Sequence, residues 1–289
     1  MHPVIYLNLM QLQNIFYFKV KKLNLLKLQK KVISTVKLAA KIFNKGAISV
    51  TQKDGAANLV TNADVEIQKF LQDRLQKILP QSGFLCEEEN VEDNKKDYVW
   101  VIDPIDGTTN FARDIPECVI SVALLYKNEP VVSVVYAPRL KLLFTATKGG
   151  GAYCCGKKIA VSDKKFEESL FCTGLCVYEK QLSNYCSEIM FKTHDLCSDI
   201  RRFGSCALEL CYLALGRCDL HFEIRTYAWD YAAGYLILTE AGGVLKGYNN
   251  EELDFRSMTM LVGANNKENF EKLNAIICET IKEKPAFRK

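Results

Sequence analysis

The first regular pattern of apolar positions along the chain has the spacing of an α-helix. Between residues 31 and 43, apolar side chains recur at positions 32, 36, 39 and 43, and the turn residues Asn44 to Gly46 follow. This spacing places the apolar side chains on one face of a helix. A second helix is predicted over about 62–79, because Thr61 and Asp64 can form a capping box at its start and Pro80 follows its end.

Short apolar runs bounded by charged or turn residues come next, and they are typical of strands. They lie at about 98–103, 119–126, 131–137 and 142–147, and a hairpin is expected through the glycine cluster at 149–151. Strands then alternate with helices: strands at about 169–175, 218–223 and 258–263, and helices at about 181–192, 205–215, near Trp229 and 266–283. Strands gathered first and later alternating with helices favour an α+β half followed by an α/β half.

The chain is predicted to divide into three segments. Charged and turn residues between Ser162 and Glu168 mark a boundary between an amino-terminal α+β half, residues 30–162, and a carboxyl-terminal α/β half, residues 163–289. Residues 1–29 are apolar but interrupted by Asn, Gln and Lys, so they contain no continuous apolar run that could span a membrane. Their lysines follow the apolar stretch, unlike those of a signal peptide, and we expect a disordered extension.

Composition adds information mainly about charge. The formal net charge is +4, but residues 1–31 hold six lysines and no acidic residue, which leaves the other 258 residues at −2. A nearly neutral body has no electrostatic footprint for nucleic acid. We therefore expect no nucleic-acid partner, and any basic effect would be confined to the amino-terminal arm.

Cysteine is abundant, with twelve residues, whereas histidine occurs only three times. The cysteines form no C-x-x-C pair, which argues against a zinc site, and a chain of this length without an export signal is not expected to need a disulfide framework. We expect the cysteines to pack as small hydrophobic side chains in a reducing cytoplasm.

The candidate chemistry is concentrated in one stretch, WVIDPIDGTTNF. Asp103 and Asp106 lie three residues apart directly after an apolar strand, and Pro104 and Gly107 permit a turn into a new element at Thr108. Carboxylate oxygens suit Mg²⁺, and free N–H groups at a helix start suit an anion such as phosphate. Taken alone, two such aspartates are most often a solvated turn, so the surrounding residues decide between the two interpretations.

Four stretches of the chain together resemble the inositol monophosphatase family of Mg²⁺-dependent, Li⁺-sensitive phosphatases. They are LVTNAD at 59–64, FLCEEE at 84–89, WVIDPIDGTTNF at 100–111 and, at 229–243, WDYAAG followed by TEAGG, in the family's order and near its spacing. The resemblance covers about residues 30–280. It implies a layered αβαβα sandwich with the site between two halves, a small phosphorylated polyol or sugar as substrate, and a homodimer.

The resemblance also implies a set of ligands for two to three Mg²⁺ ions. Glu88, Asp103 and the carbonyl oxygen of Ile105 would hold the first ion, and Asp103, Asp106 and Asp230 the second. Asp103 suits a bridging role because a carboxylate has two oxygens. The alternative for Glu88 is that the acidic run around it forms only a solvated loop.

Catalysis is assigned by resemblance to Glu88 and to Thr108, whose hydroxyl would join Asp64 in orienting the attacking water. The backbone amides of Gly107 and Thr108 would hold the phosphate. The remaining substrate contacts that the resemblance implies are Ser205, Ala207, Glu223 and Lys53. The alternative for the last of these is an ordinary surface lysine.

Two residues depart from the family's pattern near the expected leaving-group pocket. Cys206 occupies a position that is usually alanine, and Arg225 a position that is usually glycine. An arginine beside the pocket could favour a substrate with a second anionic group, such as a bisphosphate.

The sequence thus predicts a phosphomonoesterase that hydrolyses inositol monophosphate, or a similar small polyol or sugar phosphate, by attack of metal-activated water. Fructose-1,6-bisphosphatase or histidinol phosphatase activity on the same site is the alternative within the enzyme class. A nucleotide 3′-phosphatase is disfavoured by the uncharged sequence Thr109-Asn110-Phe111. A further alternative is a regulatory member of the fold that binds protein, or nucleic acid through the basic arm.

Overall fold

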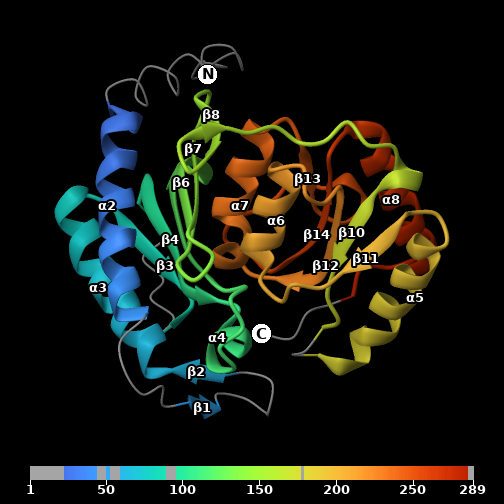
Figure 1. The fold of residues 1–289 in the computed structure, drawn as a ribbon, viewed down its shortest axis with the longest axis horizontal. Helices are drawn as coiled ribbons and strands as arrows, with labels where there is room; N and C mark the ends of the chain where they lie inside the picture. The colour runs from blue at the N-terminus through green and yellow to red at the C-terminus, as the bar shows by residue number, and fades with distance from the viewer. Residues whose placement is uncertain (1–22, 44–49, 53–58, 89–95, 177–178, 286–289) are drawn as a thin grey trace, which may run out of the picture.

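A computed structural model describes residues 23–43, 50–52, 59–88, 96–176 and 179–285. Helices and sheets alternate across the molecule in five layers, in the order helix pair, sheet, helix pair, sheet, helix pair (Figure 1). The predicted αβαβα sandwich is therefore confirmed. In the described part of the chain, no helix is long and apolar enough to cross a membrane.

The larger sheet has seven strands that follow one another in chain order. Strands β3 and β4 are parallel, and every later neighbour pair is antiparallel. The strands are β3 (Gly83–Cys86), β4 (Tyr98–Asp106), β5 (Val119–Tyr126), β6 (Glu129–Ala137), β7 (Leu142–Thr147), β8 (Gly151–Cys154) and β9 (Lys157–Lys158). The central strands β4, β5 and β6 are buried on both faces, because helices cover the two sides of the sheet.

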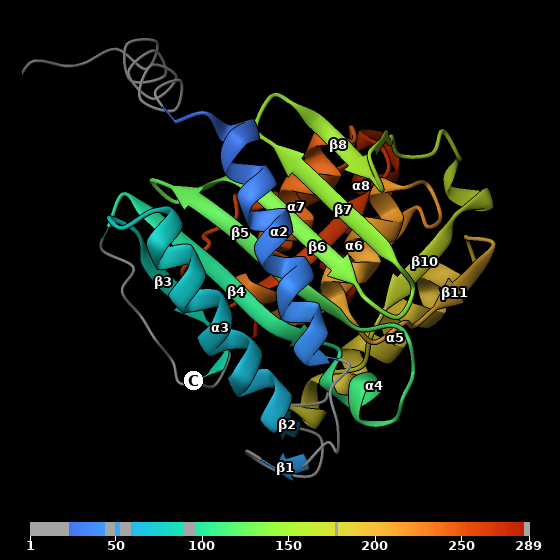
Figure 2. The same cartoon turned by 60° about the vertical axis from the view of Figure 1, so that its left-hand side comes forward.

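Helices α2 (Leu25–Phe43) and α3 (Asn62–Ile78) pack side by side on the outer face of this sheet (Figure 2). Helix α2 begins six residues earlier than predicted, because Asn24 caps it: the Asn24 side-chain oxygen accepts a hydrogen bond from the N–H of Lys27 at 2.9 Å. The capping box at the start of α3 is confirmed. The segment between these helices contributes a small antiparallel pair, β1 (Val50–Gln52) and β2 (Leu59–Thr61).

The smaller sheet has five strands in the order β11-β10-β12-β14-β13. They are β10 (Leu170–Thr173), β11 (Asp199–Arg201), β12 (Leu220–Thr226), β13 (Val244–Lys246) and β14 (Thr259–Ala264). Helices α5 (Ser183–His194) and α8 (Lys267–Thr280) cover its outer face. Within the described part of this half, short 3₁₀ turns lie at Phe166–Glu168, Lys180–Leu182 and Tyr248–Asn250.

Helices α6 (Cys206–Ala214) and α7 (Ala228–Glu240) lie between the two sheets and are apolar on almost every side. They pack closely: a Cβ added to Gly234 of α7 would lie 2.8 Å from the Cβ of Leu210 in α6. The hydrophobic cluster around them contains residues of both sheets. The division of the chain near residue 162 into two halves stays a prediction, since both halves share this core.

Candidate active site

Four aspartates from separate segments of the chain lie within electrostatic reach of one another. Asp103 and Asp106 stand in the last four residues of β4, while Asp64 and Asp230 each occupy the third position of a helix, α3 and α7. The negative charges of Asp106, Asp230 and Asp64 all act on Asp103. The stretches at 59–64, 100–111 and 229–243 thus place these carboxylates near one another. The roles that the sequence assigned to them stay predictions.

Asp103 lies at the centre of this carboxylate cluster. Its residue is 2% exposed, and its Oδ1 atom is buried without a hydrogen-bond partner among the described residues. Burial and the neighbouring carboxylates raise the pKa of Asp103 well above its usual range. A buried carboxylate oxygen that lacks a donor and faces other carboxylates is suited to a cation, and its hard oxygen suits Mg²⁺.

The other carboxylates use one oxygen each to bind the start of a helix. Asp106 Oδ2 accepts hydrogen bonds from Ser205 Oγ and from the N–H of Ala207, both at 2.7 Å, where α6 begins. Asp230 Oδ2 accepts one from the N–H of Tyr227 at 2.7 Å, where α7 begins. Burial raises the pKa of Asp106 to about 6 and that of Asp230 to about 7, although these donors oppose the shift.

The carboxylates of this cluster lie near one another but are still too far apart to coordinate one metal ion. Among the residues that the structure describes, no three His, Cys, Asp or Glu side chains are close enough to hold a metal ion as they stand. Like charges repel each other over these distances, so carboxylates without a cation between them are expected to stay apart. The second oxygens of Asp106 and Asp230 are not used in these hydrogen bonds and are available to such a cation.

Glu87 and Glu88, which follow β3, have different surroundings, and the sequence prediction considered only Glu88 as a metal ligand. Glu88, which was assigned to the first metal, is 5% exposed. The side-chain amide of Gln68 forms hydrogen bonds with both the carbonyl and the N–H of Glu88. Gln68 Nε2 donates to the Glu88 carbonyl at 2.5 Å, and the Glu88 N–H donates to Gln68 Oε1 at 2.9 Å. The glutamate whose charge acts on Asp103 is Glu87. Sequence reasoning missed both Glu87 and the clamp from Gln68.

The expected link between Thr108 and Asp64 is present but long. Thr108 Oγ1 lies 3.5 Å from Asp64 Oδ1 and 3.0 Å from the carbonyl oxygen of Ile105. A hydroxyl has one hydrogen, so the two acceptors compete and the shorter contact is favoured. Asp64 is fully buried, and its other oxygen accepts a hydrogen bond from the N–H of Thr61 at 2.8 Å.

The turn after β4 requires glycine. Gly107 has φ +88°, and a Cβ there would lie 2.9 Å from the carbonyl oxygen of Glu117. The short helix α4 (Thr108–Ala112) follows at once. Asn110 on α4 then ties the turn to the segment before α6, since its Nδ2 donates to the carbonyls of Glu117 and Phe203, each at 2.7 Å.

Ser205 and Ala207 were expected to contact the substrate, and the structure also gives them the supporting contacts to Asp106. Their own segment is held by Glu209, whose Oε1 accepts the N–H groups of Phe203 at 2.8 Å and Gly204 at 3.1 Å. Burial raises the pKa of Glu209 to about 7. The role of Glu209 was missed, because a lone polar residue within an apolar helix carries no recognisable motif. Asn110 lies within the quoted stretch WVIDPIDGTTNF, but its contact with Phe203 joins segments far apart in the sequence.

Glu223 on β12 lies near the same cluster, because the charges of Asp230 and Asp106 act on it. Burial and these neighbours raise the pKa of Glu223 well above its usual range. A Cβ on residue 174 would lie 2.9 Å from Glu223 Oε1. With any residue other than glycine at this position, the Glu223 carboxylate would have to move.

Cys206 is the first residue of α6 and lies near two buried groups, His221 and Glu209. Its Sγ is 3.9 Å from His221 Nε2, and His221 Nδ1 is 3.5 Å from Glu209 Oε2. Burial lowers the pKa of His221 to about 3, so this ring is neutral at physiological pH.

Arg225 is not a free cation at the pocket. Its Nε lies 3.1 Å from Glu179 Oε1, and its Nη2 donates to the hydroxyl of Tyr227 at 3.0 Å. Its guanidinium also lies 5.2 Å from the centre of the Tyr227 ring. The carboxylate of Glu179 compensates the charge that was expected to favour a bisphosphate. Lys53 lies outside the described residues.

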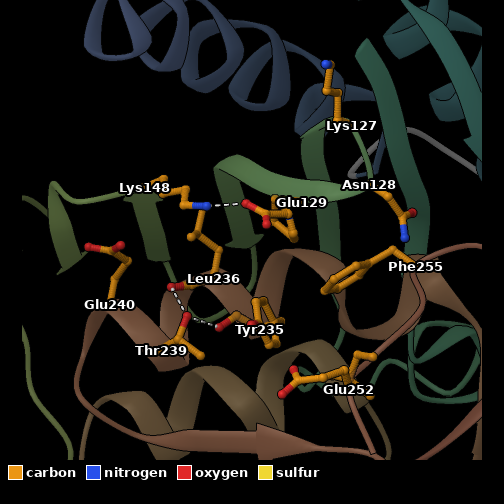
Figure 3. Close-up of a pocket in the computed structure, with 12 residues that line it drawn as sticks. Lys127, Asn128, Glu129, Lys148, Tyr235, Leu236, Thr239, Glu240, Glu252 and Phe255 are labelled. Carbon is orange, nitrogen blue, oxygen red and sulfur yellow. Dashed lines mark hydrogen bonds and ion pairs between the residues drawn. The ribbon is translucent and has the colours of Figure 1, made fainter. Parts of the chain in front are cut away.

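A separate pocket of about 510 Å³ lies between the β5–β6 turn and α7 (Figure 3). Its charged groups are largely paired: Lys148 binds Glu129, and Glu240 accepts the N–H groups of Gly149 at 2.6 Å and Gly151 at 2.7 Å. Glu240 thereby fastens the β7–β8 hairpin to the end of α7. These contacts indicate a packing role.

The chain was compared with known proteins. The model of the inositol monophosphatase family matches residues 21–282. The chain is 39% identical over 204 residues to the Nus factor SuhB of Escherichia coli K12, an alignment that covers 70% of this chain and 76% of that protein. It is 35% identical over 206 residues to an inositol-1-monophosphatase of Caulobacter vibrioides, covering 70% and 80%. Its structure matches that of an IMPase from Thermotoga maritima with a TM-score of 0.76 and 31% identity, covering 89% and 96%.

Replacing Gly107 by alanine should destabilise the fold more than the same change at Gly149. Both glycines have positive φ, but a Cβ at Gly149 meets nothing within 4 Å, whereas at Gly107 it meets backbone. We expect Gly149→Ala to cost about 1 kcal/mol of backbone strain and Gly107→Ala roughly 2 kcal/mol or more, since the Glu117 carbonyl must also move. Denaturant unfolding of the two variants measures the difference, and equal losses would show that the turn can relax.

Without divalent metal, the stability of the protein should fall as the pH rises from about 4 to about 7. Asp106 and Asp230 bind protons more tightly in the folded chain than in the unfolded chain, because their folded pKa values are raised to about 6 and about 7. Their contribution is therefore present at low pH and is lost as the pH rises through these values. Thermal unfolding in a chelator should show a shallower fall for Asp230→Asn than for the wild type, and parallel pH profiles would contradict the raised pKa.

Proposed function

This chain belongs to the inositol monophosphatase family, and we propose that it is a Mg²⁺-dependent phosphomonoesterase acting on inositol monophosphate or a similar small polyol or sugar phosphate. One observation supports this proposal above the others: the buried Oδ1 of Asp103 has no hydrogen-bond partner in the described residues, and three further aspartates lie near it. When these carboxylates are ionised, a bound cation is needed to compensate their buried charge. The anion-binding turn at Gly107 and Thr108 follows directly in the chain.

Members of this family typically use Mg²⁺, which, when bound, neutralises phosphoryl charge and lowers the pKa of water. The donors proposed to hold it are Asp103, Asp106, Asp230 and the carbonyl of Ile105, all oxygen ligands. For the remaining position, the charge of Glu87 on Asp103 supports Glu87 in place of Glu88.

The chain's own groups would perform the other tasks of the hydrolysis. The hydroxyl of Thr108, placed between Ile105 and Asp64, would orient the attacking water. The N–H groups of Gly107 and Thr108 would receive the phosphate oxygens. Ser205, Ala207 and Glu223 would contact the alcohol that leaves.

Compensation of Arg225 by Glu179 supports a substrate with one phosphate over a bisphosphate. A fructose-1,6-bisphosphatase activity would need a second cation at the pocket, and histidinol phosphatase activity would need a place for a cationic amine. The buried carboxylate of Glu223 suits either a hydroxyl-rich alcohol or such an amine. A homodimer is proposed from the family resemblance, and sedimentation velocity measures it.

Asp103→Asn should reduce phosphate release to the background level while leaving the fold intact, because it removes the central anionic ligand. The exposed Asp163→Asn is the matched control and should keep full activity. We expect the wild type to show its highest kcat/KM for inositol 1-phosphate in a panel that includes fructose 1,6-bisphosphate and histidinol phosphate. Activity retained in Asp103→Asn would refute the metal assignment, and a preference for the bisphosphate would refute the substrate class.

Glu87→Gln and Glu88→Gln separate the two candidates for the first metal position. If Glu87 is the ligand, its variant should need far more Mg²⁺ for half-maximal activity, whereas Glu88→Gln should change the Mg²⁺ requirement little. The reverse order would restore the assignment made from the sequence. Titration of phosphate release with MgCl₂ gives the comparison.

A further inference from the structure

A second charged surface lies on the opposite side of the larger sheet from α6 and α7. Helices α2 and α3 run side by side there (Figure 2). Residues of both helices line a groove of about 580 Å³. Its charged lining is Lys27, Lys30 and Lys31 from α2 and Arg74 and Lys77 from α3. No acidic residue lines this basic groove as far as the structure describes it.

The five cations of the basic groove have little compensation from the protein: Asp73 of α3 precedes Arg74 in the chain but does not line the groove. None of them forms an ion pair with a carboxylate in the described ranges, and α2 contains no acidic residue along its whole length. Other hollows differ: in the pocket beside α7, Lys148 pairs with Glu129 (Figure 3). Five uncompensated cations facing one hollow lower the free energy of an anion placed there.

The basic groove is distinct from the active site. Asp64 stands at the start of α3, and Arg74 follows ten residues later on the same helix. A rise of 1.5 Å per residue separates them by about 15 Å along the axis. An anion in the basic groove therefore cannot share the carboxylate cluster.

The shape of the groove limits the kind of anion. Lys27 and Lys31 follow each other by one helical turn, about 6 Å, so the cations form a row instead of a single point. A row of cations fits a chain of phosphates better than one phosphate group. The axes of packed helices lie roughly 8–10 Å apart, which leaves too little room for a duplex to enter, whereas a single strand can lie along the groove.

A membrane surface fits less well. Peripheral proteins bind a bilayer with apolar side chains that project from a basic face. Helix α2 has two exposed leucines, Leu26 at 61% and Leu38 at 41%. They are twelve residues apart, about 18 Å along the helix, so they form no continuous apolar face. We propose that the basic groove binds the phosphate backbone of a single-stranded nucleic acid, independently of the phosphatase site.

Fluorescence anisotropy of a labelled single-stranded RNA tests this proposal with the full-length chain. Nonspecific binding through five phosphate contacts predicts a slope of log K against log salt of about −3.5, measured between about 50 and 200 mM. Replacing one cation on each rim, in the double variant Lys31→Gln/Lys77→Gln, should weaken binding at the lower salt at least about tenfold and reduce the slope to about −2.

Two matched variants remove the same charge elsewhere. Lys157→Gln/Lys158→Gln changes the exposed strand β9, and Lys21→Gln/Lys22→Gln changes the amino-terminal arm. Both should keep the slope and stay within about twofold of the wild-type affinity. Circular dichroism and the melting temperature confirm that every variant is folded.

Three results would overturn the proposal. The first is an equal loss of affinity in either control, which would make binding a property of net charge or of the arm. The second is unchanged binding by Lys31→Gln/Lys77→Gln. The third is binding of phosphatidylserine-containing vesicles or of polyglutamate that, at matched charge and salt, is tighter than binding of the RNA and is lost in Lys31→Gln/Lys77→Gln; this would assign the basic groove to a membrane or to an acidic protein segment.

Discussion

The site depends on one constraint: several buried carboxylates must be held close together although they repel one another. The fold meets this constraint at helix starts. Asp64 and Asp230 each occupy the third position of a helix and bind the N–H of the preceding cap residue, and Asp106 binds the first donors of α6. The amino-terminal ends of these helices carry partial positive charge, which lowers the cost of the cluster. The interaction that begins each helix also fixes the orientation of a carboxylate.

Among these four aspartates, Asp103 is the one with a fully buried oxygen that has no hydrogen-bond partner in the described residues, and this asymmetry gives the cluster its centre. The layers around it keep that centre in place. Helices α6 and α7 lie between the two sheets, and their close approach at Gly234 brings the start of α7 next to that of α6. Just before α6, the carbonyl of Phe203 accepts a hydrogen bond from Asn110, and the N–H of Phe203 donates one to Glu209. A site built from distant segments is therefore held by contacts that reach across the core.

Charge is segregated in this molecule in a way that net charge hides. Carboxylates collect where helices begin, and uncompensated lysines and arginine collect along α2 and α3 on the outer face. The nearly neutral body of the chain led us to expect no nucleic-acid partner. The basic groove changes that expectation, because three of the lysines counted with the amino-terminal arm belong to a helix packed against Arg74 and Lys77.

Features that depend on neighbouring residues were predictable from the sequence alone. The period of apolar positions gave most helices and strands, the capping box at Thr61 fixed the start of α3, and the string around Asp103 identified the carboxylates and the turn at Gly107. The short strands β1, β2, β3, β9, β11 and β13 were not predicted, because a strand of two to four residues is too short to show a period.

Tertiary structure decided which polar groups meet. In the folded chain, Arg225 pairs with Glu179, and Gln68 binds the backbone of Glu88. The negative charge of Glu87 acts on Asp103. The basic residues of α2 and α3 line one groove. The physical reason is distance along the chain: each of these contacts joins segments that only the packed layers bring together, and electrostatic interactions depend on separation in space.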